Sequence, residues 1–408
     1  LGLVEIFSYW KAFCSPKIVV NAGYLDNDQL AWWKDLLSKG MGQYFYENVI
    51  DFKDNYFVTI ACHCEETREA GRRGNLNTVT ENRLPRSFRS LAMTKKEEVL
   101  KKTLIPIGGG KDSAVTLELF SNNFALDSLG IFTLNSSKHP NIEKMIKISG
   151  IKNIIRVERK IDPQLLELNK KGYLNGHTPF SAYLAFLSVF AAKLFNFDEV
   201  VLSNEKSSNE GNLEYLGVEI NHQYSKTLEF ENKFREYNSH YLSEVNYFSF
   251  LRPLYELQIM KIFSGLEKYF TSFLSCNNGT NWCGKCPKCL ASFVGLYPFI
   301  PEEKIIEIFG HNIFMDNTLI PIASEMLGLG KKKPFECVGT LEETKIAFYL
   351  SYKKITDPKS YPLLKFFIEK IMKKEKNWKK RSKLILDSWD NNHNLPQRYN
   401  NILKSLRV

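Results

Sequence analysis

Residues 103–113 read Thr-Leu-Ile-Pro-Ile-Gly-Gly-Gly-Lys-Asp-Ser, and this stretch decides the fold. Its apolar first half, residues 103–107, has the composition of a buried strand, and a helical pattern follows from Ser113. The three glycines between them let the backbone approach an anion closely, while the first turn of a helix offers free N–H groups. The sequence therefore predicts a strand, a phosphate-binding loop and a helix in direct succession.

This loop differs from two common nucleotide-binding motifs, G-x-x-x-x-G-K-[ST] and G-x-G-x-x-G. It resembles instead the S-G-G-x-D-S pyrophosphatase loop of enzymes that cleave ATP between its α and β phosphates. Gly108 stands where that loop usually has its first Ser. The resemblance implies that ATP binds here and that AMP and pyrophosphate are released. It assigns nucleotide binding to Gly108, Gly109, Gly110, Lys111, Asp112 and Ser113.

A second motif is formed by four of the eight cysteines, Cys276, Cys283, Cys286 and Cys289, which fall within fourteen residues. Four thiolates at this spacing can close a tetrahedron around Zn²⁺, although cysteines two residues apart also occur in iron–sulfur sites. We expect zinc in a structural role, because four protein ligands leave no open position. The C-x6-C-G-x-C-x-x-C spacing resembles the zinc site of 7-cyano-7-deazaguanine synthase.

Outward from the loop, short apolar runs alternate with helical patterns. Strands are expected at 129–134, 153–157 and 198–202, and helices at 139–149, 163–170, 179–195 and 223–242. The apolar stretch 179–195 indicates a buried core helix. This alternation predicts an α/β fold with a doubly wound, mostly parallel sheet. With the loop, it indicates the pyrophosphatase-loop type, similar to adenine nucleotide alpha hydrolases.

The predicted organisation has four parts. Residues 1–90 form a small N-terminal α+β region, with a strand at 17–20, a helix over 27–46, a strand near 56–61 and a polar linker at 66–90. Residues 91–275 form the ATP pyrophosphatase-loop domain. Residues 276–340 hold a zinc-knuckle insertion and helices, and residues 341–408 form a basic helical C-terminus.

The net charge of +10 comes entirely from the C-terminal segment. Residues 351–408 hold 15 Lys and Arg against 5 Asp and Glu, so the rest of the chain is neutral. A neutral body argues against a nucleic-acid partner. No apolar run reaches the 18 residues of a membrane span, and the opening lacks a signal-peptide pattern, so we expect a cytoplasmic protein. Leu1 is not Met, so the sequence leaves open whether the N-terminus is truncated.

Five polar strings lie at predicted loops. They are NGHTP at 175–179, SNEKS at 203–207, EINHQYSK at 219–226, LRPL at 251–254 and PFECVG at 334–339. Ligands bind at the carboxyl ends of strands in doubly wound sheets. Asn204 and Glu205 follow the strand at 198–202, so we expect them to face the same crevice as the glycine loop.

In this order, with GGGKDS and WCGKCPKC, the strings resemble one family, the ATP-dependent UDP-N-acetylmuramoyl-L-alanyl-L-glutamate epimerases of peptidoglycan synthesis. The resemblance runs from about Ser8 to Gly339. It implies an isomerase of cell-wall synthesis, and so of cell shape and division, with UDP-MurNAc-L-Ala-L-Glu as small-molecule substrate. The L-glutamate would be inverted through a carboxyl adenylate. An adenylate is a better electron sink than a free carboxylate, so a side-chain base can then remove the α-proton.

For this reaction we expect Mg²⁺ to bridge the phosphates, with Asp112 and Glu205 as candidate ligands. Asn204 is assigned to the nucleotide site. Candidates for the epimerising base are His177, His222, Cys337 and Glu336. Three alternatives stay open: a nucleobase- or tRNA-modifying adenylating enzyme, such as one forming 7-deazaguanine nitrile or thiolating tRNA; an ATP-dependent amide ligase; and a non-catalytic zinc-stabilised nucleotide-binding module.

Overall fold

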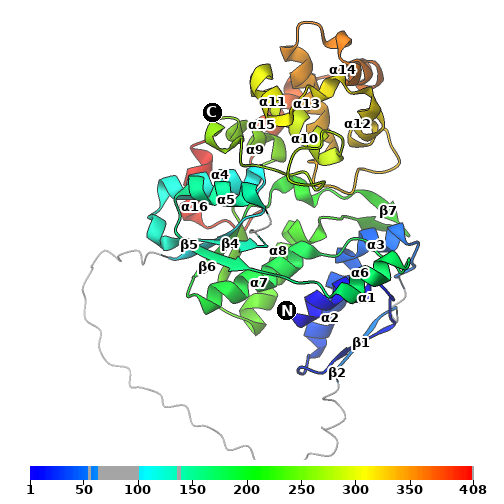
Figure 1. Cartoon of the computed structure of the whole chain (residues 1–408), viewed down its shortest axis with the longest axis vertical. Coiled ribbons are helices and arrows are strands. Elements are labelled where there is room, and N and C mark those ends of the chain that lie inside the picture. The colour runs from blue at the N-terminus through cyan, green and yellow to red at the C-terminus, as the bar shows by residue number, and fades with distance from the viewer. Residues whose placement is uncertain (54–56, 63–100, 136–138, 407–408) are drawn as a thin grey trace, which may run out of the picture.

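A five-stranded parallel sheet lies at the centre of the computed structural model, which describes residues 1–53, 57–62, 101–135 and 139–406 (Figure 1). Its strands are β3 (Thr103–Pro106), β4 (Leu129–Leu134), β5 (Asn153–Val157), β6 (Glu199–Leu202) and β9 (Asn246–Ser249). The order is β5-β4-β3-β6-β9, and every neighbouring pair is parallel. The order reverses between β3 and β6, so the predicted doubly wound sheet is confirmed and has its switch point there.

Alternate residues of each strand feed two separate hydrophobic cores. Ile105 and Val201 point into one core, and their neighbours Leu104 and Val200 point into the other. The first core is covered by α4 (Lys111–Asn123), α5 (Pro140–Ser149) and α9 (Glu256–Phe263), and the second by α7 (Phe180–Leu194) and α8 (Leu228–Tyr241). Both faces of the sheet are therefore buried, as expected for an all-parallel sheet.

The N-terminal region packs on the second core as a small α+β unit. Its elements are α1 (Gly2–Trp10), β1 (Lys17–Val20), α2 (Asn27–Gly40), α3 (Gly42–Glu47) and β2 (Thr59–Cys62). The predicted helix over 27–46 is wrong in one respect, because it is divided at Met41. The backbone there is crowded by neighbours: a Cβ on Gly40 would lie 2.8 Å from Pro179, and one on Gly42 would lie 3.0 Å from Ile220.

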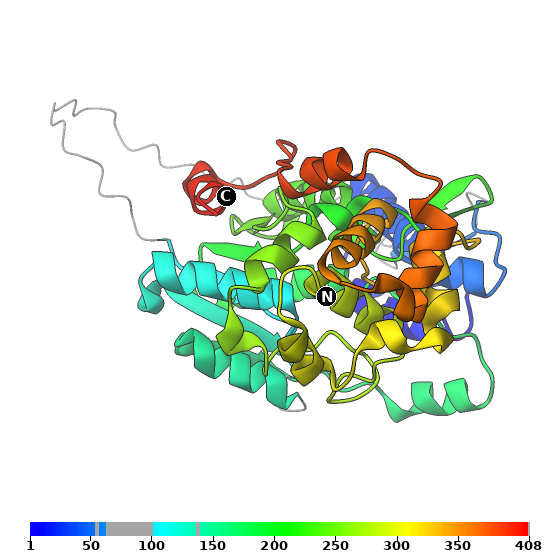
Figure 2. The same cartoon turned by 90° about the horizontal axis from the view of Figure 1, so that it is seen from above.

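The C-terminal third is helical, as predicted. It contains α10 (Pro287–Leu296), α11 (Glu302–Phe309), α12 (Ile320–Met326), α13 (Leu341–Lys354), α14 (Pro362–Phe367), α15 (Trp378–Leu386) and α16 (Gln397–Lys404). Figure 2 shows the chain after α13 running along one side of the molecule before α16 returns to the sheet. There the rings of Tyr399 and Phe248 of β9 lie 5.4 Å apart. The first core is therefore continuous from the sheet into the C-terminal helices.

Two further expectations need correction. The helix predicted over 223–242 begins only at Leu228, because Thr227 caps it by accepting the N–H of Phe230. The predicted core helix is buried on one face only, since Phe190 and Leu194 of α7 are 54% and 61% exposed. No sequence pattern indicated β9 or the hairpin of β7 (Leu213–Tyr215) and β8 (Val218–Ile220). The helix α6 (Pro163–Lys170) was predicted, but its packing outside the sheet was not.

The predicted linker at 66–90 lies outside the described residues, as does the boundary at residue 90. The division into four parts therefore stays a prediction. Within the described ranges, every helix is too short or too polar to cross a bilayer.

Candidate active site

The glycine loop joins the end of β3 to the start of α4, at the switch point of the sheet. Gly109 has a φ of +81°, which favours glycine, and a Cβ there would lie 2.9 Å from Ile142. The Gly108 N–H donates to Ser113 Oγ at 3.2 Å, which closes the loop onto the helix. The helix begins at Lys111, two residues before its predicted start, and no side chain in the described part of the chain caps it. Its first N–H groups can therefore receive an anion.

A buried ammonium group lies between two carboxylates beside this loop. The Lys111 ammonium is almost fully buried and lies 3.0 Å from both Asp112 Oδ1 and Glu256 Oε1. Burial alone would lower the pKa of Lys111, but these two carboxylates raise it, so the lysine stays charged. Burial, helped by the negative charges of Asp112 and Glu256, raises the pKa of Glu205 to about 7. Glu205 is thus a carboxylate that a cation would stabilise.

A cavity of about 610 Å³ opens from the loop across the carboxyl ends of β3 and β6. This volume is in the range of small-molecule sites. The expected crevice is therefore confirmed, since Asn204 and Glu205 line it together with the glycine loop. Polar side chains from the rest of the chain also line it: Asn135, His139, Ser203, Lys226, Glu256, Lys288 and Cys337.

Cys337 and Lys226 lie together in the lining of the cavity. The Lys226 ammonium lies 3.2 Å from Cys337 Sγ, and the sulfur raises the pKa of Lys226 above its ordinary value. His222 Nε2 lies 4.0 Å from the same sulfur, and the rings of His222 and His177 lie 6.0 Å apart. Burial, with the nearby positive charges, lowers the pKa of His222 to about 2 and that of His177 to about 4. Both imidazoles are therefore neutral near pH 7.

The four candidate bases do not share one environment. Among these described side chains, Cys337 is the one that lines the cavity. His222 and His177 lie behind it, and the Nε2 of His177 is buried without a hydrogen-bond partner. Glu336 turns toward the cysteine cluster, where its Oε2 accepts from Asn277 at 3.3 Å and lies 3.6 Å from the Lys288 ammonium.

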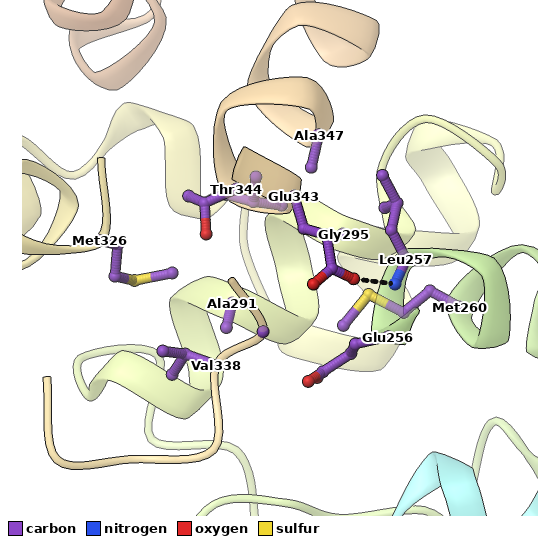
Figure 3. Close-up of a pocket in the computed structure, with 12 residues that line it drawn as sticks. Glu256, Leu257, Met260, Ala291, Gly295, Met326, Val338, Glu343, Thr344 and Ala347 are labelled. Carbon is purple, nitrogen blue, oxygen red and sulfur yellow. Dashed lines mark hydrogen bonds between the residues drawn. The ribbon is translucent and has the colours of Figure 1, made fainter. Parts of the chain in front are cut away.

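Glu343, a buried carboxylate on α13, lies beside the start of α9, as Figure 3 shows. Glu343 accepts hydrogen bonds from the Leu257 N–H at 2.9 Å and the Ser207 hydroxyl at 2.7 Å. It thereby ties the start of α9, which carries Glu256, to the loop after Glu205. Beside it lies a second cavity of about 20 Å³, room for about one water molecule.

The four predicted metal ligands lie together. Every pair of sulfurs from Cys276, Cys283, Cys286 and Cys289 lies within 4.8 Å. Three of the separations are 3.9, 3.7 and 3.5 Å. A tetrahedron with metal–sulfur bonds of about 2.3 Å has edges of about 3.8 Å, so the donor set fits one tetrahedral ion. The cluster borders the cavity, because Cys276 belongs to both.

Comparison with protein-family models identifies the family of the chain. A family model described as the MurL N-terminal domain matches residues 1–250, and one described as the MurL C-terminal domain matches residues 269–382. The chain belongs to the MurL family. The two MurL matches cover the glycine loop, the cysteine cluster and Cys337, which are the three features that surround the cavity.

Three relatives carry the name UDP-N-acetyl-alpha-D-muramoyl-L-alanyl-L-glutamate epimerase. The protein of a Micromonospora species is 39% identical over 259 residues, covering 61% of this chain and 56% of the relative. That of Salinispora tropica is 38% identical over 260 residues, covering 61% and 55%. That of Xanthomonas oryzae pv. oryzae is 29% identical over 369 residues, covering 85% and 72%. The chain spans little more than half the length of the first two.

In this MurL-family chain, four residues of the site carried no assignment from the sequence. Lys226 and Arg252 stand inside polar strings, and Lys288 stands between two cysteines. These surroundings indicate a functional region but do not assign a role to the three residues. Glu256 had no signal, because it stands among ordinary helical residues. It reaches the site through its contact with Lys111, which is 145 residues away in sequence.

Proposed function

We propose that this MurL-family chain inverts the α-carbon of the terminal L-glutamate of UDP-MurNAc-L-Ala-L-Glu, using ATP to activate the neighbouring carboxylate. The observation that carries the proposal is that one cavity joins the glycine loop to the Cys337–Lys226 pair. The names of the three relatives supply the substrate.

The nucleotide half of the proposal rests on the loop and the fold. We assign the sheet to the pyrophosphatase-loop type, supported by its doubly wound order and by a glycine loop after its first strand. In this assignment the N–H groups of Gly109, Gly110 and the start of α4 hold phosphate oxygens, while that of Gly108 keeps the loop closed on Ser113. Asp112 and Glu205 would hold Mg²⁺, which neutralises phosphate charge when bound. Asn204 lies at the rim, where its amide donates to Ser249 Oγ at 3.2 Å.

In the first step a carboxylate oxygen of the substrate attacks the α-phosphorus of ATP, and pyrophosphate leaves. The resulting acyl adenylate has one negative charge fewer at the carboxyl group, so its α-proton is more acidic. A base then removes this proton, and a proton returns on the opposite face. Water finally cleaves the adenylate to give the carboxylate and AMP.

For the base we propose Cys337, because its sulfur faces the cavity and has an ammonium group at 3.2 Å. An adjacent ammonium favours the thiolate, which is the proton-accepting form. His222 and His177 are less suited, because they lie behind the sulfur and burial keeps both rings neutral. Glu336 is less suited, because it is directed at Asn277 and Lys288.

The cysteine cluster is proposed to hold a structural Zn²⁺. Four thiolates complete a tetrahedral shell and leave no position for substrate. The ion would stabilise residues 276–289, which contribute Cys276, Asn277 and Lys288 to the cavity wall. Such thiols stay reduced in the cytoplasm, where we place the reaction.

The test is incubation with ATP, Mg²⁺ and UDP-MurNAc-L-Ala-L-Glu in D₂O, followed by chiral analysis of the glutamate. We expect D-glutamate with deuterium at Cα, together with AMP and pyrophosphate. No exchange should occur without ATP or with α,β-methylene ATP, which cannot form an adenylate. Formation of ADP and phosphate would exclude the adenylate, and deuterium uptake with the methylene analogue would show that nucleotide binding alone is enough.

A further inference from the structure

Arg252 is the largest fully buried side chain in the described part of the protein, and it carries out no step of the reaction above. It follows β9, in a segment between the sheet and α9. Its Nη1 donates to the carbonyl oxygen of Glu205 at 2.6 Å, and its Nη2 donates to the carbonyl oxygen of Lys226 at 2.6 Å. One planar guanidinium therefore holds the backbone at two positions that are 21 residues apart in sequence.

Both positions contribute a side chain to the lining of the cavity. The Glu205 side chain lies with the carboxylates beside the glycine loop, and the Lys226 side chain lies against Cys337. Lys226 ends a short 3-10 helix, Tyr224–Lys226, and Glu205 precedes another, Lys206–Asn209. Ser208 Oγ completes the bridge, at 2.8 Å from the Glu205 oxygen and 3.1 Å from the Lys226 oxygen, and Arg252 Nη1 donates to it at 3.0 Å.

Burying the charged guanidinium of Arg252 costs free energy, whereas burying an apolar side chain at this position would not. The positive charge is balanced by Glu231, whose Oε2 lies 3.2 Å from Nη2, but Arg252 Nε is buried without a partner. An unpaired buried donor destabilises the folded state. Two carbonyl oxygens at a fixed separation suit the rigid fork of a guanidinium, whereas a lysine has a single ammonium that cannot span them in the same way.

We propose that Arg252 is a positioning residue that sets the distance between the two halves of the site. It places the carboxylate of Glu205 for magnesium and nucleotide, and the ammonium of Lys226 for Cys337. This inference rests on the proposed function and deepens it, since a loss of Arg252 impairs adenylation and α-proton exchange together. A change at Glu205 alone impairs adenylation first, and a change at Cys337 alone stops exchange while pyrophosphate release continues.

The test compares Arg252→Lys with wild type in both partial reactions, pyrophosphate release and α-proton exchange, each divided by the amount of folded protein. We expect both rates to fall about 100-fold, because misplacement by about 1 Å has effects of this size. The matched control is Arg235→Lys. Arg235 donates to Asn246 and to the carbonyl oxygen of Tyr247 on β9 and contacts neither loop, so both rates should stay near wild type.

A second measurement needs no substrate. Alkylation of Cys337 by iodoacetamide, followed by mass spectrometry of its peptide, reports the ammonium beside the sulfur, because the thiolate is the reacting form. We expect it to be about tenfold slower in Arg252→Lys, as for a loss of about 1.4 kcal/mol of charge stabilisation. If the wild-type protein performs no epimerisation, the proposed function is wrong. The alkylation rate of Cys337 still tests whether Arg252 positions Lys226, because it needs no substrate. Unchanged alkylation, or unchanged rates per folded molecule, would reduce Arg252 to a purely structural role.

Discussion

Replacing Glu205 by glutamine should make the folded protein more stable at pH 8 and at the same time prevent it from binding magnesium and ATP. Burial and the charges of Asp112 and Glu256 raise the pKa of Glu205 from 4.5 to about 7. Below pH 4.5 the carboxyl group is protonated in both the folded and the unfolded protein. Between pH 4.5 and 7 it loses its proton more readily in the unfolded chain, so the free energy of unfolding falls as pH rises.

The size of this loss follows from the two pKa values. Their difference, converted at about 1.4 kcal/mol for each pH unit, is about 3 kcal/mol, and the whole amount is lost above pH 7. Glutamine has nearly the same shape and does not ionise, so the variant avoids the loss. With an unfolding entropy of about 2.1 cal/mol/K for each of 408 residues, the gain corresponds to about 3–4 °C in Tm.

The assay is thermal unfolding of both proteins at pH 5 and pH 8 in magnesium-free buffer, repeated with Mg²⁺ and ATP. The Tm difference between variant and wild type should grow from pH 5 to pH 8. Magnesium and ATP should raise the Tm of wild type and leave that of the variant unchanged, because a ligand stabilises only a protein that binds it. A Tm difference that is independent of pH would refute the reasoning about burial, and a normal ligand shift in the variant would refute Glu205 as a magnesium ligand.

Glu199 provides the matched control. It is also fully buried, but Thr103 Oγ1 donates to it at 2.9 Å and Arg398 lies 2.5 Å away, so its charge is compensated. Glu199→Gln leaves the Arg398 guanidinium without its partner, and it should therefore lower the Tm at both pH values. At pH 8, replacement by glutamine should thus raise the Tm at Glu205 and lower it at Glu199.

Two further outcomes are expected. Cys286→Ser should lower the zinc content and the Tm together, because metal binding is coupled to folding, while Cys14→Ser should change neither; iron with acid-labile sulfide in the wild type would refute zinc. The pKa of His177, about 4, and that of His222, about 2, keep both rings neutral from pH 5 to 8. The rate of α-proton exchange should therefore show no histidine step in this range, and a step near pH 6.5 that disappears in His222→Gln would contradict the assignment.

Local sequence determined the central sheet well. The bounds of β4, β5 and α6 agree with their predicted ranges, because each is an apolar or periodic run closed by residues that break it. The glycine loop was equally readable, since a turn between a strand and a helix depends on neighbouring residues. By contrast β9, with the short run Asn-Tyr-Phe-Ser, has no clear period, and it is a strand because β6 pairs with it.

The cysteine cluster was predictable for the same local reason. Its four cysteines lie within fourteen residues, and that spacing restricts where the thiols can go. The crevice was predictable in outline, because carboxyl ends of parallel strands meet at one edge of a sheet. That rule brings Asn204 and Glu205 to the glycine loop without any knowledge of their side-chain contacts.

Only the tertiary structure decided which candidate base reaches the cavity. Cys337 meets Lys226 across 111 residues and His222 across 115, and no sequence pattern encodes contacts of that separation. The same holds for Glu256 beside Lys111 and for Arg252 between Glu205 and Lys226. The sequence by itself therefore determined most elements around the central sheet, the glycine loop and the cysteine cluster. The relative placement of the two halves of the site depends on long-range packing, in which many residues of both cores act together.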